Sequence, residues 1–142
     1  MLDPEYGSSM NVDDVVGMVR HLYGHRVRFH DGDAELAPGL SVHHIGGHTD
    51  GLQAVRVMTK RGWVVMASDA CHLYANMEQR NPFPIIFDLE AVLAGYDRLS
   101  ELAPSPDHIV PGHDPLVLDR YPAVSEDLDG IAVRLDEGPV SQ

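Results

Sequence analysis

This chain has few of the features that mark secreted or membrane-spanning proteins. Its single cysteine, Cys71, excludes an intrachain disulfide framework. No apolar run approaches the ~20 residues that are needed to cross a bilayer. The first residues have neither the basic nor the apolar region of a signal peptide. We therefore expect a cytoplasmic protein that does not associate with membranes.

Basic residues are also scarce. The sequence has 10 Lys and Arg against 22 Asp and Glu, which gives a formal net charge of −12. Nucleic acids and anionic lipids are bound through basic surfaces, so we expect neither as a partner. The simplest interpretation of this charge is a solvated acidic surface.

The length and the hydropathy pattern predict one ordinary α/β (α+β) domain over residues 1–142. Hydrophobic residues make up 44% of the chain, which is enough for a core. Apolar spacing predicts helices over residues 12–23, 72–80 and 88–102. Short strands are predicted over residues 26–29, 34–37, 40–45, 52–59, 63–68, 108–110 and 131–135. This order indicates one mostly antiparallel sheet layer with helices on its outer face.

Three potential metal ligands each follow a short apolar run. His48 follows the run at 40–45 and two glycines, Asp69 follows the run at 63–68, and His113 follows the run at 108–110 and a Pro-Gly pair. Because such runs are typical of buried strands, we expect these side chains to meet at one edge of the sheet. Two imidazoles and a carboxylate suit zinc or a similar divalent ion. Taken singly, each residue could instead be a loop histidine, a helix cap or a turn histidine.

In this order and at this spacing, the three motifs resemble the second half of the metallo-β-lactamase-fold hydrolases, above all the N-acyl homoserine lactonase-like branch. The motifs read Gly-Gly-His-Thr-Asp-Gly at 46–51, Ser-Asp-Ala at 68–70 and Pro-Gly-His-Asp at 111–114. The resemblance extends from about residue 27 to the end of the chain. It implies the C-terminal half of an αββα sandwich and Zn²⁺ as the cofactor, with two ions in a complete site.

The resemblance also implies a role for each residue. His48 would complete the shell of one ion, His113 that of the other, and Asp69 would bridge both. The family's His-x-His-x-Asp-His motif, which supplies the ligands of the first half, does not occur in the sequence. In some lactonases a tyrosine three residues after the bridging aspartate holds the substrate. That position is His72 here and Tyr74 follows it, so the candidate catalytic residues are Asp69, His72 and Tyr74.

The implied activity is hydrolysis of a lactone or related ester by a metal-bound hydroxide, as in quorum-quenching lactonases. The alternative is a non-catalytic fragment or binding module that cannot assemble the two-metal site alone. A chain that lacks the first half of the fold could pair with another chain that supplies it. It could also self-associate through the exposed face of its sheet, which would carry Val55, Val57, Val65 and Ile109. No Ser–His–Asp order with nucleophile-elbow glycines occurs, so the sequence does not support serine catalysis.

Other side chains near these motifs are weaker candidates. His43 and His44 lie on opposite faces of a predicted strand, and a packing role is favoured over metal ligation for both. Cys71 fits a small buried hydrophobe better than a ligand, and Asp114 could orient its neighbour in the third motif. Apolar residues that could line an acyl-chain pocket, or pack in the core, are Met77, Phe83, Ile85 and Phe87.

Overall fold

The computed structural model describes residues 11–140, and the chain divides into two compact units, Met1–His30 and Asp31–Gln142. The described part of the first unit contains helix α2 (Val12–Tyr23), as the sequence predicts. The helix begins at Asn11, whose side chain accepts a hydrogen bond from the backbone N–H of Asp13 at 2.9 Å. Its apolar side chains recur at helical spacing and are exposed.

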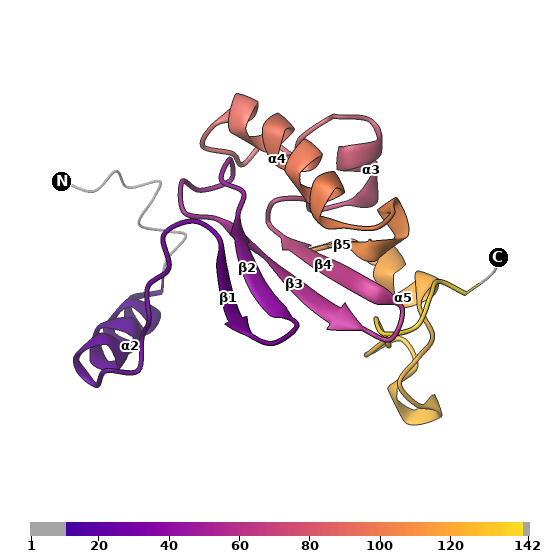
Figure 1. Ribbon diagram of the computed structural model, residues 1–142, viewed down its shortest axis with the longest axis horizontal. Coiled ribbons are helices and arrows are strands. Elements are labelled where there is room, and N and C mark those ends of the chain that lie inside the picture. The colour runs from indigo at the N-terminus through magenta and orange to yellow at the C-terminus, as the bar shows by residue number, and fades with distance from the viewer. Residues whose placement is uncertain (1–10, 141–142) are drawn as a thin grey trace. The chain divides into compact units, whose positions relative to one another are not determined.

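The second unit is built on a five-stranded sheet whose strands lie in sequence order, as Figure 1 shows. The strands are β1 (Ala34–Ala37), β2 (Leu40–His44), β3 (Gln53–Thr59), β4 (Gly62–Ser68) and β5 (Ile109–Pro111). The first four pair antiparallel, and β5 runs parallel to β4. The mostly antiparallel layer predicted from the sequence is therefore confirmed.

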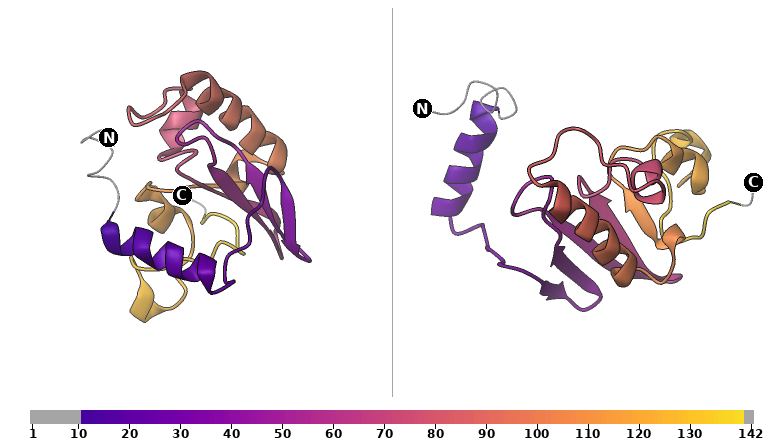
Figure 2. Two further views of the ribbon diagram at one scale, coloured as in Figure 1. Left: turned by 90° about the vertical axis from the view of Figure 1, so that its left-hand side faces the viewer. Right: turned by 90° about the horizontal axis from the view of Figure 1, so that it is seen from above.

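Helix α4 (Leu89–Leu102) covers one face of this sheet (Figures 1 and 2). It begins at Asp88, whose side chain accepts from the backbone N–H of Ala91 at 3.0 Å. Its buried face packs on Val65 and Ile109, which are 0% and 4% exposed and lie directly opposite each other in β4 and β5. This layer of helix on sheet forms the core of the unit.

The opposite face of the sheet carries the residues that alternate with those of the core. Val55 lies opposite Met66, and Val57 lies opposite Val64, so all four point away from α4. Met66 is 45% exposed, whereas Val64 is buried. A cavity of about 310 Å³ opens beside Val55 and Met66 on this face.

The prediction that Val65 and Ile109 lie on the exposed face is wrong, because both pack beneath α4. The prediction for Val55 and Val57 is correct in direction, and both are half-buried. The error has a physical cause. Strand β4 is apolar on both faces, and such a run does not reveal which alternate residues face the helix.

The remaining elements are short. They are α3 (Tyr74–Glu78), two 3₁₀ turns at Pro106–His108 and Glu126–Leu128, and α5 (Leu116–Arg120). Helix α5 lies in a segment that the sequence pattern predicted as a loop. The strands predicted over residues 26–29 and 131–135 are wrong. The second run makes a single bridge, Ala123 to Val133, and the first lies outside every strand, because neither meets a partner strand along its length. Within residues 11–140 no helix is both long and apolar enough to cross a membrane.

Candidate metal centre

A tight turn after β4 presents Asp69 at the edge of the sheet. Ser68 adopts a φ of 50°, in the left-handed region that residues other than glycine rarely occupy. The turn closes through hydrogen bonds from Ala70 N–H to the carbonyl of Ala67 at 3.1 Å and from Cys71 N–H to that of Ser68 at 3.2 Å. The side chain of Asp69 stays 34% exposed at the carboxyl end of the strand. Backbone strain of this kind is characteristic of functional sites.

The loop after β5 brings His113 to the same place. Gly112 donates its N–H to the carbonyl of Cys71 at 2.9 Å, and His113 donates its N–H to the carbonyl of His72 at 3.0 Å. A Cβ on Gly112 would lie 2.7 Å from the carbonyl oxygen of Ser68. Only glycine permits this close approach of two backbones. The carboxyl ends of β4 and β5 are therefore locked side by side.

The result is a cluster of three potential ligands, Asp69, His72 and His113, whose ligand atoms all lie within 4.8 Å of one another. Oδ1 of Asp69 lies 2.7 Å from Nε2 of His113 and 3.1 Å from Nε2 of His72. Because an ionised carboxylate only accepts, each imidazole donates to it through Nε2. The ring of His72 stacks on Phe83 with 3.4 Å between centroids.

The structure thus brings two of the three predicted ligands together and adds His72. The resemblance to lactonases implied that His72 is a substrate contact rather than a ligand. The signal that could have found it is the Asp-x-x-His spacing, because a chain that turns immediately after β4 returns the third residue to the first. Asp69 and His72 are hydrogen-bonded across this spacing.

The electrostatics of the cluster suit a cation. Burial alone would raise the pKa of Asp69, but the hydrogen bond from His113 and the charges of the surrounding histidines lower it overall. Burial lowers the pKa of His72, and the neighbouring His113 lowers it further, against the opposing effect of Asp69. An ionised carboxylate and a neutral imidazole are the forms that bind a metal.

The third predicted ligand, His48, is held beside this cluster. Its Nδ1 lies 2.8 Å from the carbonyl oxygen of Ile85, so Nδ1 carries the hydrogen and Nε2 keeps its lone pair. Metal-binding histidines are commonly oriented in this way. Its ring centroid lies 5.9 Å from that of His72 and 5.5 Å from that of Phe83. His48 therefore lines the same site but is not one of the three clustered ligands.

Gly47 positions the loop that carries His48. It has a φ of 85°, and a Cβ there would lie 2.7 Å from the backbone nitrogen of Val92 in α4. Its carbonyl accepts hydrogen bonds from the backbone N–H groups of Phe87 and Asp88 at 2.9 and 3.0 Å. The loop after β2 is thus docked on the start of α4, which is why a glycine is required here.

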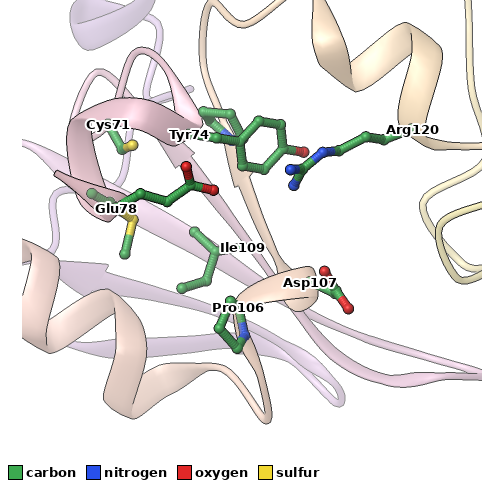
Figure 3. A pocket seen from close by; sticks show the side chains of 9 residues that line it. Cys71, Tyr74, Glu78, Pro106, Asp107, Ile109 and Arg120 are labelled. Atoms are coloured by element: carbon green, nitrogen blue, oxygen red, sulfur yellow. The ribbon is translucent and has the colours of Figure 1, made fainter. Parts of the chain in front are cut away.

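Tyr74 lies apart from the cluster. Its side chain is buried, and its hydroxyl has no hydrogen-bond partner within the described part of the chain. The guanidinium of Arg120 lies 3.9 Å from the centre of its ring. Figure 3 shows the hydroxyl pointing toward Arg120 in a small cavity of about 140 Å³ that Glu78 also lines. The backbone N–H of Tyr74 donates to Asp114, so that carboxylate secures this loop rather than orienting His113.

The weaker candidates are explained by other contacts. His44 contacts the carbonyl of Asp50 at 2.7 Å, and His43 contacts Asp33 at 2.8 Å. Cys71 is 1% exposed, and burial raises the pKa of its thiol to about 12, as expected of a small buried hydrophobe. Of the four residues proposed for an acyl-chain pocket, Met77 packs on the core, Phe83 stacks on His72, and Ile85 and Phe87 are exposed.

No protein-family model matches the chain. The chain is 38% identical over 86 residues to an N-acyl homoserine lactonase from Bacillus sp, a match that covers 59% of this chain and 34% of that protein. The N-acyl homoserine lactonase AiiA of Bacillus thuringiensis subsp. kurstaki is 34% identical over 86 residues with the same coverage. The chain therefore spans about a third of the length of the curated relatives that it matches.

Solved structures show the same similarity to N-acyl homoserine lactone hydrolases. A crystal structure of a quorum-quenching N-acyl homoserine lactone hydrolase superposes with a TM-score of 0.54 at 33% identity, over 61% of this chain and 36% of that one. The chain is therefore similar to N-acyl homoserine lactonases in both sequence and fold. The dizinc lactonase AidC shares the fold of this lactonase-like chain, with a TM-score of 0.58 at 18% identity over 79% of this chain and 38% of that one.

Proposed function

We propose that this lactonase-like chain forms part of a metal-dependent lactone hydrolase. The observation that carries the proposal is the convergence of His72 and His113 on Oδ1 of Asp69. In the absence of an ion, protons on the two Nε2 atoms satisfy the carboxylate. A divalent cation would take the place of those protons, since imidazole nitrogens and a carboxylate oxygen are the donors that zinc binds.

The residues fit distinct parts of a two-metal site. Asp69 would bridge the ions, His113 would bind one, and His48 would bind the other through the Nε2 that its bond to Ile85 leaves free. The bound ions would supply a hydroxide near neutral pH and polarise the substrate carbonyl. Of the two residues considered for holding the substrate, Tyr74 has a buried hydroxyl, and His72 would bind an ion together with Asp69 instead.

The relatives support a lactone as the substrate. The curated relatives are named N-acyl homoserine lactonases. One solved structure at 33% identity holds the product N-hexanoyl-L-homoserine at its catalytic metal centre. We extend zinc dependence, quorum quenching and a cytoplasmic location to this protein on the same similarity. A non-catalytic binding role is the second candidate, and the similarity to active lactonases favours the enzyme.

Zinc binding by the 142-residue chain tests the site directly. Equilibrium dialysis should give zinc binding that Asp69→Ala and His113→Ala each weaken by more than tenfold. A matched control is His21→Ala, because His21 is an exposed histidine of α2 in the other unit. If His21→Ala weakens binding as much as His113→Ala, zinc binds to scattered surface histidines, and the proposed centre is wrong.

Activity requires a second experiment. In a protein that joins this chain to a segment with the His-x-His-x-Asp-His ligands, we expect zinc-dependent hydrolysis of an N-acyl homoserine lactone. Asp69→Ala should abolish that hydrolysis, because the carboxylate that would join the two ions is lost. Full lactone turnover by the Asp69→Ala variant would exclude Asp69 from the mechanism.

A further inference from the structure

A second group of chemically active side chains lies on the α4 side of strand β2. Ser41 and His43 are two residues apart in the strand, so their side chains share one face. Oγ of Ser41 lies 2.9 Å from Nε2 of His43, and Nδ1 of His43 lies 2.8 Å from Oδ2 of Asp33. Because the carboxylate only accepts, Nδ1 carries the hydrogen and Nε2 of the neutral ring accepts from the Ser41 hydroxyl.

This order of atoms is that of a serine nucleophile with its base and its orienting carboxylate. Sequence motifs do not reveal it, because the chain order is Asp33, Ser41, His43 and no nucleophile-elbow glycines surround the serine. Such a group is recognised by its geometry and not by its sequence order.

Asp33 is fixed in the form that this arrangement needs. Its Oδ1 accepts from the backbone N–H of His44 at 3.0 Å, and its Oδ2 also accepts from the guanidinium of Arg98 at 2.7 Å. The hydrogen bond from His43 is the largest influence on its pKa, and together with these donors it lowers the pKa against the opposing effect of burial. The carboxylate is therefore ionised near neutral pH and held toward His43.

The residue opposite Ser41 in the next strand is cationic. Arg56 lies directly opposite Ser41 in the β2–β3 register, and side chains in that relationship are neighbours. Nε of Arg56 is buried and has no hydrogen-bond partner within the described residues, while its guanidinium lies 4.2 Å from the centre of the Trp63 ring. A positive charge on the same face of the sheet as the nucleophile favours the negative oxygen of an acyl-transfer intermediate.

We propose that Ser41 is a metal-independent nucleophile that hydrolyses small activated carboxylic esters. Oγ of Ser41 attacks the carbonyl carbon while Nε2 of His43 takes the hydroxyl proton. The ester C–O bond then breaks, and the leaving alcohol takes that proton from His43. Water then attacks the carbonyl carbon of the acyl-Ser41 ester while His43 accepts a proton from the water. The bond between the acyl carbon and Oγ breaks, the carboxylic acid leaves, and Oγ takes the proton back from His43. Ser41 is half-buried, which restricts the acyl group to a small one.

The test uses the 142-residue chain in the presence of a metal chelator, which separates this site from the proposed zinc centre. p-Nitrophenyl acetate should give an initial burst of p-nitrophenolate, and an alkyl fluorophosphonate should label Ser41 as located by peptide mass spectrometry. Ser41→Ala should remove both signals. His43→Gln should slow labelling by about 10²–10⁴-fold, which is the usual contribution of a general base.

Ser105 provides a matched control. Its Oγ lies 2.8 Å from Nδ1 of His108, but the other nitrogen of that ring contacts the carbonyl of Arg61 and not a carboxylate. Ser105→Ala should leave the burst and the labelling of Ser41 unchanged. Zinc in place of chelator should also leave the labelling rate unchanged.

Two results would overturn the proposal. The first is no label on Ser41 in a chain whose circular dichroism shows that it is folded. The second is equal labelling of Ser41 in the His43→Gln variant, which would mean that the imidazole does not activate it. In either case the three residues are only a polar contact that joins the segment before β1 to β2.

Discussion

Gly112 and Ser68 touch through their backbones, and a single Cβ on Gly112 would collide with the Ser68 carbonyl. This contact joins the carboxyl ends of β5 and β4, which are parallel neighbours in the sheet. It places His113 beside Asp69, 44 residues earlier in the chain. The geometry of the candidate metal centre thus depends on a residue that has no ligand atom of its own.

Gly112→Ala should therefore affect both stability and metal binding. The added methyl group would force the two backbones apart, at a cost of about 1–3 kcal/mol of unfolding free energy. Zinc affinity should fall because Asp69 and His113 would separate. Urea unfolding and zinc dialysis measure the two effects. The control is Gly138→Ala, because nothing lies within 4 Å of a Cβ there; equal effects of the two variants would contradict the close contact.

Leu99→Ala should be strongly destabilising. Leu99 is 0% exposed at the centre of the core between α4 and the sheet. Deleting its side chain would leave a cavity and lower the unfolding free energy by about 2–5 kcal/mol. Leu89 of the same helix is 53% exposed, so Leu89→Ala should change the unfolding free energy by about 0.5 kcal/mol or less. Chemical denaturation of both variants measures the difference between their unfolding free energies. Equal values for the two variants would show that α4 does not pack on the sheet.

Cys71 should resist thiol reagents in the native chain. Burial raises its pKa to about 12, so at pH 8 the thiol is protonated and the reactive thiolate is nearly absent. Raising the pH toward 12 should increase the alkylation rate, while denaturant at pH 8 should expose the thiol and speed the reaction at once. The measurement is the rate of iodoacetamide modification by mass spectrometry. Rapid modification of the native chain at pH 8 would show that Cys71 is not buried.

The isolated chain should self-associate through the sheet face opposite α4. Met66 is the exposed apolar residue that lines the cavity on that face, so Met66→Asp should raise the monomer fraction in light scattering. Leu116 is equally exposed on α5, so Leu116→Asp is the control and should have little effect. A wild-type chain that is fully monomeric at high concentration would contradict this prediction.

The 142-residue chain alone should have little lactonase activity. A catalytic zinc normally has about three protein ligands and a water. Here His48, Asp69, His72 and His113 would be divided between two ions, so each ion would lack ligands. Zinc content and lactone turnover after zinc loading measure this directly. Two tightly bound zinc ions per chain with rapid turnover would show that the site is complete without further ligands.

Several features of the fold and site could be read from the sequence because their causes are local. Alternating apolar residues and Gly-containing turns predicted the meander, and Asp88 with an apolar stripe predicted α4. The resemblance of the motifs around His48, Asp69 and His113 to those of lactonases implied a lactonase-like site. These signals lie within single elements or follow them directly, so they do not depend on which elements pack together.

Other features were decided only by tertiary structure. The sequence could not show that Val65 faces α4, because a strand apolar on both sides has two equivalent orientations until a helix covers one. The Asp-x-x-His spacing allows His72 to join Asp69 but does not fix that contact, since it depends on the turn after Ser68, and no sequence pattern shows that Asp33 meets His43. That last contact needs the segment before β1 to lie beside β2 and α4. Contacts between separate elements are set by packing, and packing is not encoded in the order of residues within any one of them.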